Sequence, residues 1–202
     1  MTKIKLCGLT RLSDIEAVNT LKPDYIGFVF AQKSKRCISY DKASELKKSL
    51  NPNIKAVGVF VNEEIQTVAN AFNLGIIDFV QLHGNEDEQY IIKLRELIRC
   101  PIIRAYVIKS KADVTPAESS VADFILLDSG AGTGKGFDLS LISDIKRPYF
   151  LAGGLDVNNV SSAIKNVKPY GVDVSSGIES NGLKDKTKMA AFVTAVRKED
   201  IK

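Results

Sequence analysis

Short apolar runs alternate along the whole chain with longer segments that have helical periodicity. The runs are rich in β-branched and aromatic residues, which favour strands. We expect strands at 4–7, 25–30, 54–61, 79–82, 102–107, 124–128, 149–152 and 171–174. Regular alternation of strands with helices is typical of an α/β protein with a parallel sheet.

The intervening segments carry apolar residues at every third or fourth position, which is the pattern of an amphipathic helix. The pattern is clearest within 65–72, 90–98, 157–167 and 189–196. Ser13 with Glu16, and Asn85 with Glu88, have the spacing of capping boxes or close variants of them. We therefore expect helices to begin at Ser13 and Asn85.

The even spacing of the expected strands favours closure of the sheet. Successive strands begin about 20 to 30 residues apart, the length of one strand, one helix and two short loops. Right-handed crossovers repeated eight times predict a (β/α)8 TIM barrel, formed as a single domain by residues 1–202, with an open doubly wound sheet as the main alternative. The poorest helical patterns, at 112–121 and 138–145, follow the fifth and sixth strands.

Composition and charge narrow the range of partners. Of the 202 residues, 45% are hydrophobic, and no apolar run approaches the roughly 18 residues that span a bilayer. With no targeting segment evident at the N-terminus, we expect a cytoplasmic protein without a membrane partner. The net charge of +4 comes from interspersed charges, which favours a small anionic ligand over nucleic acid.

The cysteines and the histidine give no metal or disulfide pattern. Cys7, Cys37 and Cys100 are odd in number and widely spaced, which argues against a disulfide framework and against a CxxC site. The single histidine, His83, has no partners with zinc-ligand spacing. We expect free thiols and no metal.

In a barrel of this kind, functional groups lie at the carboxyl ends of the strands. Cys7 ends the first expected strand, and Asp128 ends the sixth. A buried structural thiol and a loop-capping carboxylate are the ordinary alternatives. The first and sixth strands lie on nearly opposite sides of a closed barrel, so we expect Cys7 and Asp128 to face each other as a base and an acid acting on one molecule.

The seventh and eighth strands are followed by glycines and serines. Glycines let backbone N–H groups approach an anion, serines add hydroxyl donors, and a short helix after the eighth strand would add its positive end. Loops seven and eight of a barrel commonly hold a phosphate, so we predict a phosphate site here, with ordinary glycine turns as the alternative. Its residues are Gly153, Gly154, Ser175, Ser176 and Gly177.

The loop after the sixth strand, 129–136, superficially has the form of a Walker A motif. Only three residues separate Gly130 from the Gly134–Lys135 pair, and Gly136 stands where a magnesium-binding Ser or Thr is needed. We interpret the loop as a glycine-hinged lid that closes over a ligand, with the lysine reaching an anionic group. The lid residues are Gly130, Gly132, Gly134 and Lys135.

Two further side chains lie near strand ends. Arg36 follows the second strand and has the geometry to pair with a carboxylate or phosphate, although it stands among Lys33 and Lys35 and a solvated arginine is an equal alternative. His83 follows the fourth strand in register with the site. A lone histidine is more often structural than ligand-binding.

Motifs in order along nearly the whole chain resemble those of the phosphoribosylanthranilate isomerase family of tryptophan biosynthesis. They are residues 5–10 (KLCGLT), 27–30 (GFVF) with 34–36 (SKR), 81–84 (QLHG), 127–128 (LD) with 132–134 (GTG), 151–155 (LAGGL) and 171–179 (GVDVSSGIE). The resemblance implies an Amadori rearrangement of N-(5-phosphoribosyl)anthranilate to 1-(2-carboxyphenylamino)-1-deoxyribulose 5-phosphate. It implies no metal and no organic cofactor.

The resemblance also assigns roles to residues. The family's general acid falls on Asp128, its general base on Cys7, and its anthranilate-contacting arginine on Arg36. The phosphate loops fall on the glycines and serines already named. From their positions at the ends of the fourth and eighth strands, we also expect His83 and Asp173 to be substrate-binding residues. Lys35 and Leu139 depart from the family pattern, at positions that often hold proline and tryptophan.

Several alternatives stay open at this point. Indole-glycerol-phosphate synthases use lysine and glutamate at strand ends, and ribulose-phosphate epimerases use paired aspartates with a metal; neither set is evident. A non-catalytic sensor that keeps the phosphate loops is a different class. Related aminoaldose phosphates are alternative substrates, and we expect a monomer or a homodimer.

Overall fold

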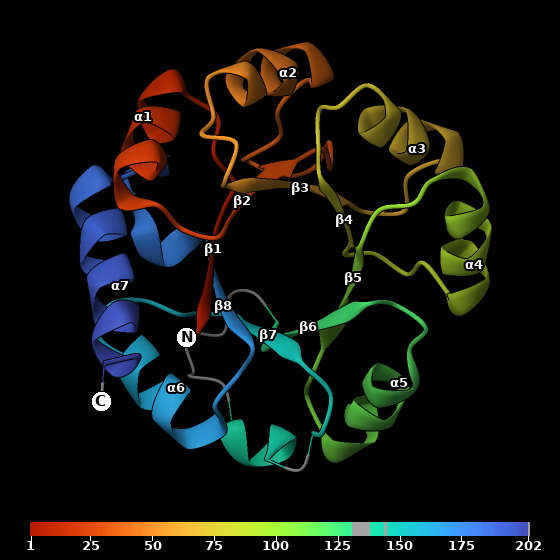
Figure 1. The fold of residues 1–202 in the computed structure, drawn as a ribbon. Coiled ribbons are helices and arrows are strands. Elements are labelled where there is room, and N and C mark those ends of the chain that lie inside the picture. The colour runs from red at the N-terminus through yellow and green to blue at the C-terminus, as the bar shows by residue number, and fades with distance from the viewer. Residues whose placement is uncertain (131–137, 144, 202) are drawn as a thin grey trace.

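The computed structural model describes residues 1–130, 138–143 and 145–201, and within them the chain forms a closed parallel barrel inside a ring of helices (Figure 1). The barrel strands are β1 (Lys3–Cys7), β2 (Tyr25–Val29), β3 (Lys55–Phe60), β4 (Phe79–Leu82), β5 (Ile102–Val107), β6 (Phe124–Asp128), β7 (Tyr149–Ala152) and β8 (Gly171–Val174). The helices are α1 (Leu12–Leu21), α2 (Tyr40–Lys48), α3 (Ile65–Asn73), α4 (Glu88–Leu97), α5 (Val114–Ser119), α6 (Val160–Val167) and α7 (Lys186–Glu199).

The first and last barrel strands pair with each other, which closes the sheet. β1 hydrogen-bonds in parallel to β2 on one side and to β8 on the other, so that Lys5 is opposite Tyr25 and Asp173. The closed (β/α)8 barrel is therefore confirmed and the open doubly wound sheet is wrong. The strand bounds agree with the sequence pattern to within one residue at each end.

The helices with the strongest apolar periodicity form as expected, in α3, α4 and α7. α6 begins at Val160 rather than near 157, because the Asp156 carboxylate accepts hydrogen bonds from the backbone of Asn158 and Asn159 and holds that segment in a turn. The weak patterns correspond to the six-residue α5 and to a short 3-10 helix, η2 (Leu139–Ile142).

Both expected helix starts are wrong. Ser13 is the second residue of α1, whose N-cap is Arg11 and whose first turn is held by the Asp14 carboxylate. Asn85 lies in the loop before α4, and Asp87 caps that helix by accepting from the backbone N–H of its third residue. In each case an aspartate supplies a charged acceptor, which makes a stronger bond to free N–H groups than Ser or Asn.

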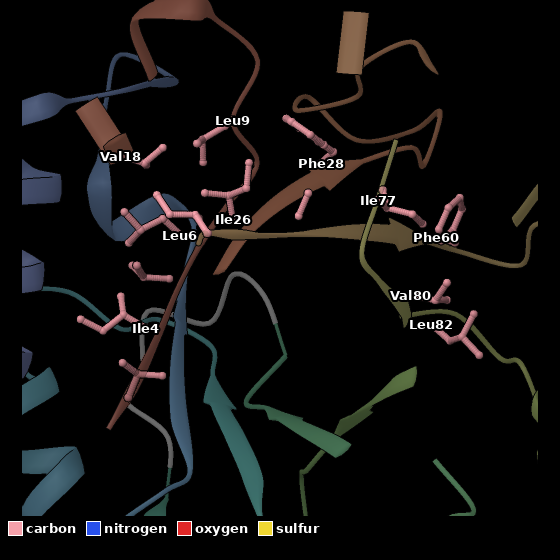
Figure 2. Packing of buried hydrophobic residues seen from close by; sticks show 14 of the residues in the cluster. Ile4, Leu6, Leu9, Val18, Ile26, Phe28, Phe60, Ile77, Val80 and Leu82 are labelled. Atoms are coloured by element: carbon pink, nitrogen blue, oxygen red, sulfur yellow. The ribbon is translucent and has the colours of Figure 1, made fainter. Parts of the chain in front are cut away.

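Two apolar layers surround the strands. The outer layer lies between the sheet and the helices and includes Leu6, Ile26, Phe28 and Phe60, all buried (Figure 2). The inner layer fills the barrel. Its lower part is a group of rings at the amino ends of the strands, which we call the aromatic floor, made by Tyr25, Phe79, Phe124, Phe150 and Tyr170.

The aromatic floor closes one end of the barrel. Phe150 contacts Tyr25 and Tyr170 edge to face, with ring centroids 5.5 and 5.3 Å apart, a geometry favoured by the ring quadrupoles. Polar groups inside the barrel therefore lie toward the opposite end, where the strands terminate.

Phe150→Ala should test how much the floor contributes to stability. The Phe150 ring is fully buried at the centre of the aromatic floor, so removing the ring should lower the free energy of unfolding, measured in urea, by about 3–5 kcal/mol. Leu74→Ala is the control: this side chain is 74% exposed, and its truncation should change the value by no more than about 0.5 kcal/mol. Equal effects of the two changes would show that the floor is not a packed core.

Candidate active site

A cavity of about 670 Å³ opens at the carboxyl ends of the strands. This volume suits a small organic ligand. Of the residues predicted from the sequence, the following line it: Cys7, Arg36, His83, Asp128, Gly130, Gly153, Gly154, Asp173, Ser175 and Ser176. These residues, which are distant in the sequence, therefore lie around one cavity.

Cys7 and Asp128 enter the cavity from separate parts of the barrel wall. Cys7 ends β1 and Asp128 ends β6, with β7 and β8 between them on the shorter path around the barrel. Gly27 on β2 makes room for the thiol, since a Cβ atom at that position would lie 2.5 Å from Sγ. A ligand in the cavity contacts both side chains only if it spans the space between the two walls.

A buried ion pair lies next to the thiol. Lys5 precedes Cys7 by two residues on β1, so both side chains face the barrel interior. Lys5 is completely buried, and its Nζ lies 3.0 Å from Oδ1 of Asp173 on β8. Lys5 was missed by the sequence analysis, although a lysine at inward register within an apolar strand was a usable signal.

Burial is the largest single influence on the pKa of Cys7 and on that of Lys5. It raises the pKa of Cys7 by disfavouring the thiolate, and the positive charges of Lys5 and Lys184 offset this only in part. For Lys5, burial opposes the charged form, but Asp173 and Cys7 together outweigh it and raise the pKa of the lysine. The thiol that lines the cavity thus has a lysine beside it whose charged form is favoured by Asp173.

Asp128 is held from one side by the backbone. Its Oδ1 accepts a hydrogen bond of 2.8 Å from the N–H of Gly130, and its Oδ2 lies 3.7 Å from Nε2 of His83. Burial lowers the pKa of His83, although Asp128 and Asp173 act in the opposite direction. His83 is therefore placed beside the predicted acid as a neutral ring.

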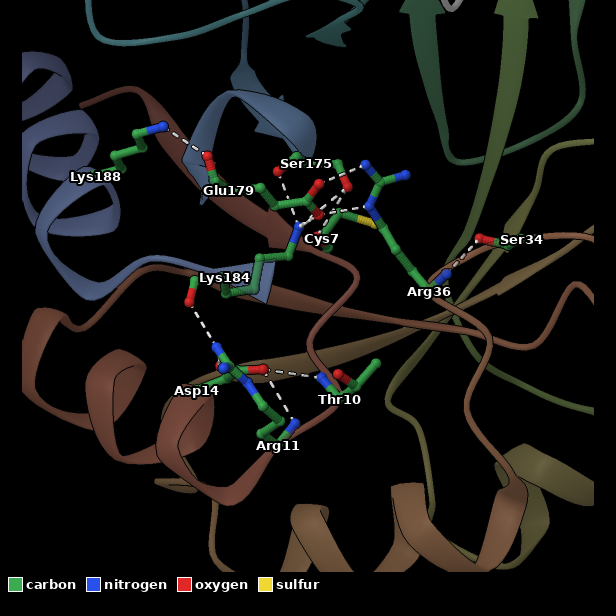
Figure 3. A network of polar contacts seen from close by, with 10 residues as sticks. All are labelled: Cys7, Thr10, Arg11, Asp14, Ser34, Arg36, Ser175, Glu179, Lys184 and Lys188. Atoms are coloured by element: carbon green, nitrogen blue, oxygen red, sulfur yellow. Dashed lines mark hydrogen bonds and ion pairs between the residues drawn. The ribbon is translucent and has the colours of Figure 1, made fainter. Parts of the chain in front are cut away.

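Arg36 pairs with a carboxylate, but this carboxylate belongs to the protein. Its Nε and Nη2 donate bonds of 2.6 and 2.8 Å to the two oxygens of Glu179, so a solvated surface arginine is wrong (Figure 3). Nζ of the buried Lys184 lies 2.6 Å from the same carboxylate. Glu179 and Lys184 belong to a small hairpin of β9 (Glu179–Ser180) and β10 (Leu183–Lys184).

The loops after β7 and β8 pack tightly against their neighbours. Gly153 and Gly154 have φ of +88° and +66°, in the left-handed region that favours glycine, and a Cβ at Gly153 would lie 2.2 Å from Ser129 Oγ. The Ser175 hydroxyl donates to the carbonyl of Cys7. The expected helix after β8 is a single 3-10 turn, η3 (Ser176–Ile178).

Gly177 does not line the cavity. A Cβ there would lie 2.0 Å from the carbonyl oxygen of Leu155, so the missing side chain lets the loops after β7 and β8 pack together.

Of the expected lid, Gly130 lies at the cavity rim, whereas Gly132, Gly134 and Lys135 lie outside the described residues. Among the described residues, no cluster of three or more His, Cys, Asp or Glu side chains is arranged to hold a metal ion.

The chain matches a known protein family over nearly its whole length. Residues 4–195 match the family model of N-(5'phosphoribosyl)anthranilate (PRA) isomerase. An N-(5'-phosphoribosyl)anthranilate isomerase of Endomicrobium trichonymphae is 44% identical, with 98% of this chain and 99% of the relative covered. The chain belongs to the phosphoribosylanthranilate isomerase family.

Two solved structures of the phosphoribosylanthranilate isomerase family extend this result. One is an isomerase in complex with reduced 1-(o-carboxyphenylamino)-1-deoxyribulose 5-phosphate, with a TM-score of 0.88, 37% identity, and coverage of 98% of this chain and 100% of that one. The other consists of monomers of the dimeric Thermotoga maritima isomerase, with the same TM-score, identity and coverage.

Family membership decides between the alternatives left by the sequence. The protein is an isomerase, and its assignment to an indole-glycerol-phosphate synthase, a ribulose-phosphate epimerase or a non-catalytic sensor is wrong. No helix among the described residues combines the length and the apolar character needed to cross a membrane.

The ionisation of Cys7 is testable by alkylation in a Cys37→Ser, Cys100→Ser background. Because burial raises its pKa, the iodoacetamide reaction should follow an ionisation above the ordinary thiol value of about 8.5. Exchanging the buried pair by Lys5→Met with Asp173→Asn should move the curve to still higher pH, since the lysine acts on the sulfur more strongly than Asp173 does.

Lys3→Met is the control for this measurement. Lys3 lies on the same strand but pairs with Asp24 and is partly exposed, so its loss should leave the alkylation curve of Cys7 in place. A curve at or below the ordinary thiol value in the parent protein would contradict the expected effect of burial.

Proposed function

We propose that this isomerase converts N-(5-phosphoribosyl)anthranilate to 1-(2-carboxyphenylamino)-1-deoxyribulose 5-phosphate with Asp128 as general acid and Cys7 as general base. The observation that carries the proposal is their common cavity, which they enter from β6 and β1. An acid and a base on different walls suit a reaction at two atoms of one sugar.

In the first step, Asp128 gives its proton to the furanose ring oxygen. The bond from that oxygen to C1 breaks, and the anthranilate nitrogen supplies an electron pair that forms a C=N bond with C1. The product of this step is an open-chain iminium ion. The carboxylate that remains on Asp128 already has a donor on one oxygen, the N–H of Gly130 at 2.8 Å.

In the second step, Cys7, which has released its thiol proton to solvent and is a thiolate, takes the proton from C2. The electron pair of that C–H bond forms a C1=C2 double bond, the iminium nitrogen becomes neutral, and the enolamine then tautomerises to the C2 ketone. Positive charge on the iminium favours the thiolate, as do Lys5 and Lys184. These three charges oppose burial, which favours the protonated thiol.

Arg36 is proposed to bind the anthranilate carboxylate. Glu179 occupies its Nε and Nη2, and Nη1 donates no hydrogen bond to any side chain or carbonyl in the described part of the chain. The two hydrogen bonds to Glu179 orient the guanidinium, so that less side-chain entropy is lost when a second carboxylate binds.

The phosphate is proposed to bind at the loops after β7 and β8. Gly153, Gly154, Ser175 and Ser176 line that part of the cavity, and a Cβ at Gly154 would meet no atom within 4 Å. Open space beside a glycine backbone allows the close approach of an anion. Phosphate binding at a distance from the reacting carbons orients the sugar for both proton transfers.

Cys7→Ser and Asp128→Asn should each lower kcat by about a hundredfold or more, because each removes a proton-transfer group. Loss of the fluorescence of phosphoribosylanthranilate measures turnover. Cys37→Ser is the matched control, since that thiol does not line the cavity and its loss should leave kcat unchanged. Near-normal turnover of either site variant would remove the role proposed for that residue.

Arg36→Met should raise KM about tenfold or more, because it removes one member of a charge-assisted pair. The effect should be much smaller for an analogue that carries aniline in place of anthranilate and so lacks the carboxylate. An equal rise in KM for both substrates would instead place Arg36 outside the contact with that group.

A further inference from the structure

Gln81 has an unusual hydrogen-bonding state for a core residue. It lies on β4, is 1% exposed and lines the cavity. Among the described residues, its Oε1 is the one buried side-chain oxygen or nitrogen without a hydrogen-bond partner. Buried polar atoms are nearly always paired, so an amide retained here in place of an apolar side chain points to a role in the site.

The other end of the amide contacts His83. Nε2 of Gln81 lies 2.9 Å from Nδ1 of His83, two residues further along the same face of the chain. An amide nitrogen only donates hydrogen bonds, so Nδ1 accepts, and the proton of the neutral ring is carried by Nε2. That protonated nitrogen is the one that faces Oδ2 of Asp128, at 3.7 Å.

We propose that Gln81 and His83 are positioning residues for Asp128. Gln81 holds the ring as the Nε2–H tautomer, and this N–H donates to Oδ2 once the acid has lost its proton. Gly130 N–H already donates to Oδ1, so each oxygen of the resulting carboxylate has a donor of its own. The inference rests on the proposed function, in which Asp128 is the acid.

The opposite tautomer would act against the reaction. With the proton on Nδ1, the Nε2 lone pair would face the newly formed negative charge and disfavour proton transfer from Asp128. Asp173, Lys5 and Arg104 also act on the His83 ring through their charges. Of the groups around this ring, Gln81 is the one whose hydrogen bond to Nδ1 selects the tautomer.

The test uses the fact that His83 is the only histidine in the chain. Protein labelled with 15N-histidine gives one pair of ring-nitrogen signals, which show directly where the proton resides. In the wild type we expect an unprotonated Nδ1 and a protonated Nε2. In Gln81→Glu the new carboxylate accepts from Nδ1, so we expect the proton to appear there.

We expect kcat to depend on which nitrogen of the His83 ring carries the proton. Gln81→Glu should lower kcat roughly tenfold or more with little change in KM, an effect of the size seen when other hydrogen-bond partners of functional histidines are removed. Gln81→Met keeps the side-chain length but has no hydrogen bond to Nδ1, so it should give mixed tautomers and an intermediate kcat. Gln66→Glu makes the same change at an exposed position of α3 and should alter neither the ring-nitrogen signals nor kcat.

Three results would overturn the inference: a wild-type ring protonated on Nδ1, a changed tautomer with unchanged kcat, or a lost kcat with the wild-type tautomer in both Gln81 variants. Asp128→Asn separates this inference from the proposed function. If that variant turns over normally, the acid assignment fails. If it loses kcat while the Gln81 variants keep theirs, only the positioning role fails.

Discussion

The pairing of β1 with β8 is the constraint on which the site depends. It closes the barrel and places Lys5 opposite Asp173, so that a lysine with no access to solvent finds an anion 3.0 Å away. A buried ammonium without such a partner would be strongly destabilising. The same pair lies beside Cys7, which couples closure of the barrel to the charge around the proposed base. The closure of the barrel and the surroundings of the proposed base therefore depend on the same pair of strands, β1 and β8.

Much of this arrangement was predictable from local patterns. The eight strands were found because each is a short β-branched or aromatic run bounded by turns, and Cys7, Asp128 and the paired glycines were found because strand ends meet at one rim of a barrel. These predictions need only the order of elements and the direction of the strands. They do not depend on the conformation of any one side chain.

Some of the features that were missed or wrong are decided by contacts between distant residues. Arg36 and Glu179 are far apart in the sequence, and nothing local indicates that the arginine would be clamped by an internal carboxylate. The helix starts failed for a different, local reason: Asp14 and Asp87, within a few residues of the predicted caps, accept the hydrogen bonds of the first turn instead. The packing role of Gly177 was missed because the contact between the loops after β7 and β8 is visible only when both loops are in place.

The aromatic floor has a consequence for the order of events in the reaction. Its rings fill the barrel at the amino ends of the strands, while the cavity lies at the carboxyl ends, so in the described part of the chain a ligand enters and leaves at the same end of the barrel. Substrate and product therefore use the same end of the barrel, and product must leave before the next substrate binds. Product that stays in this cavity would exclude substrate from it.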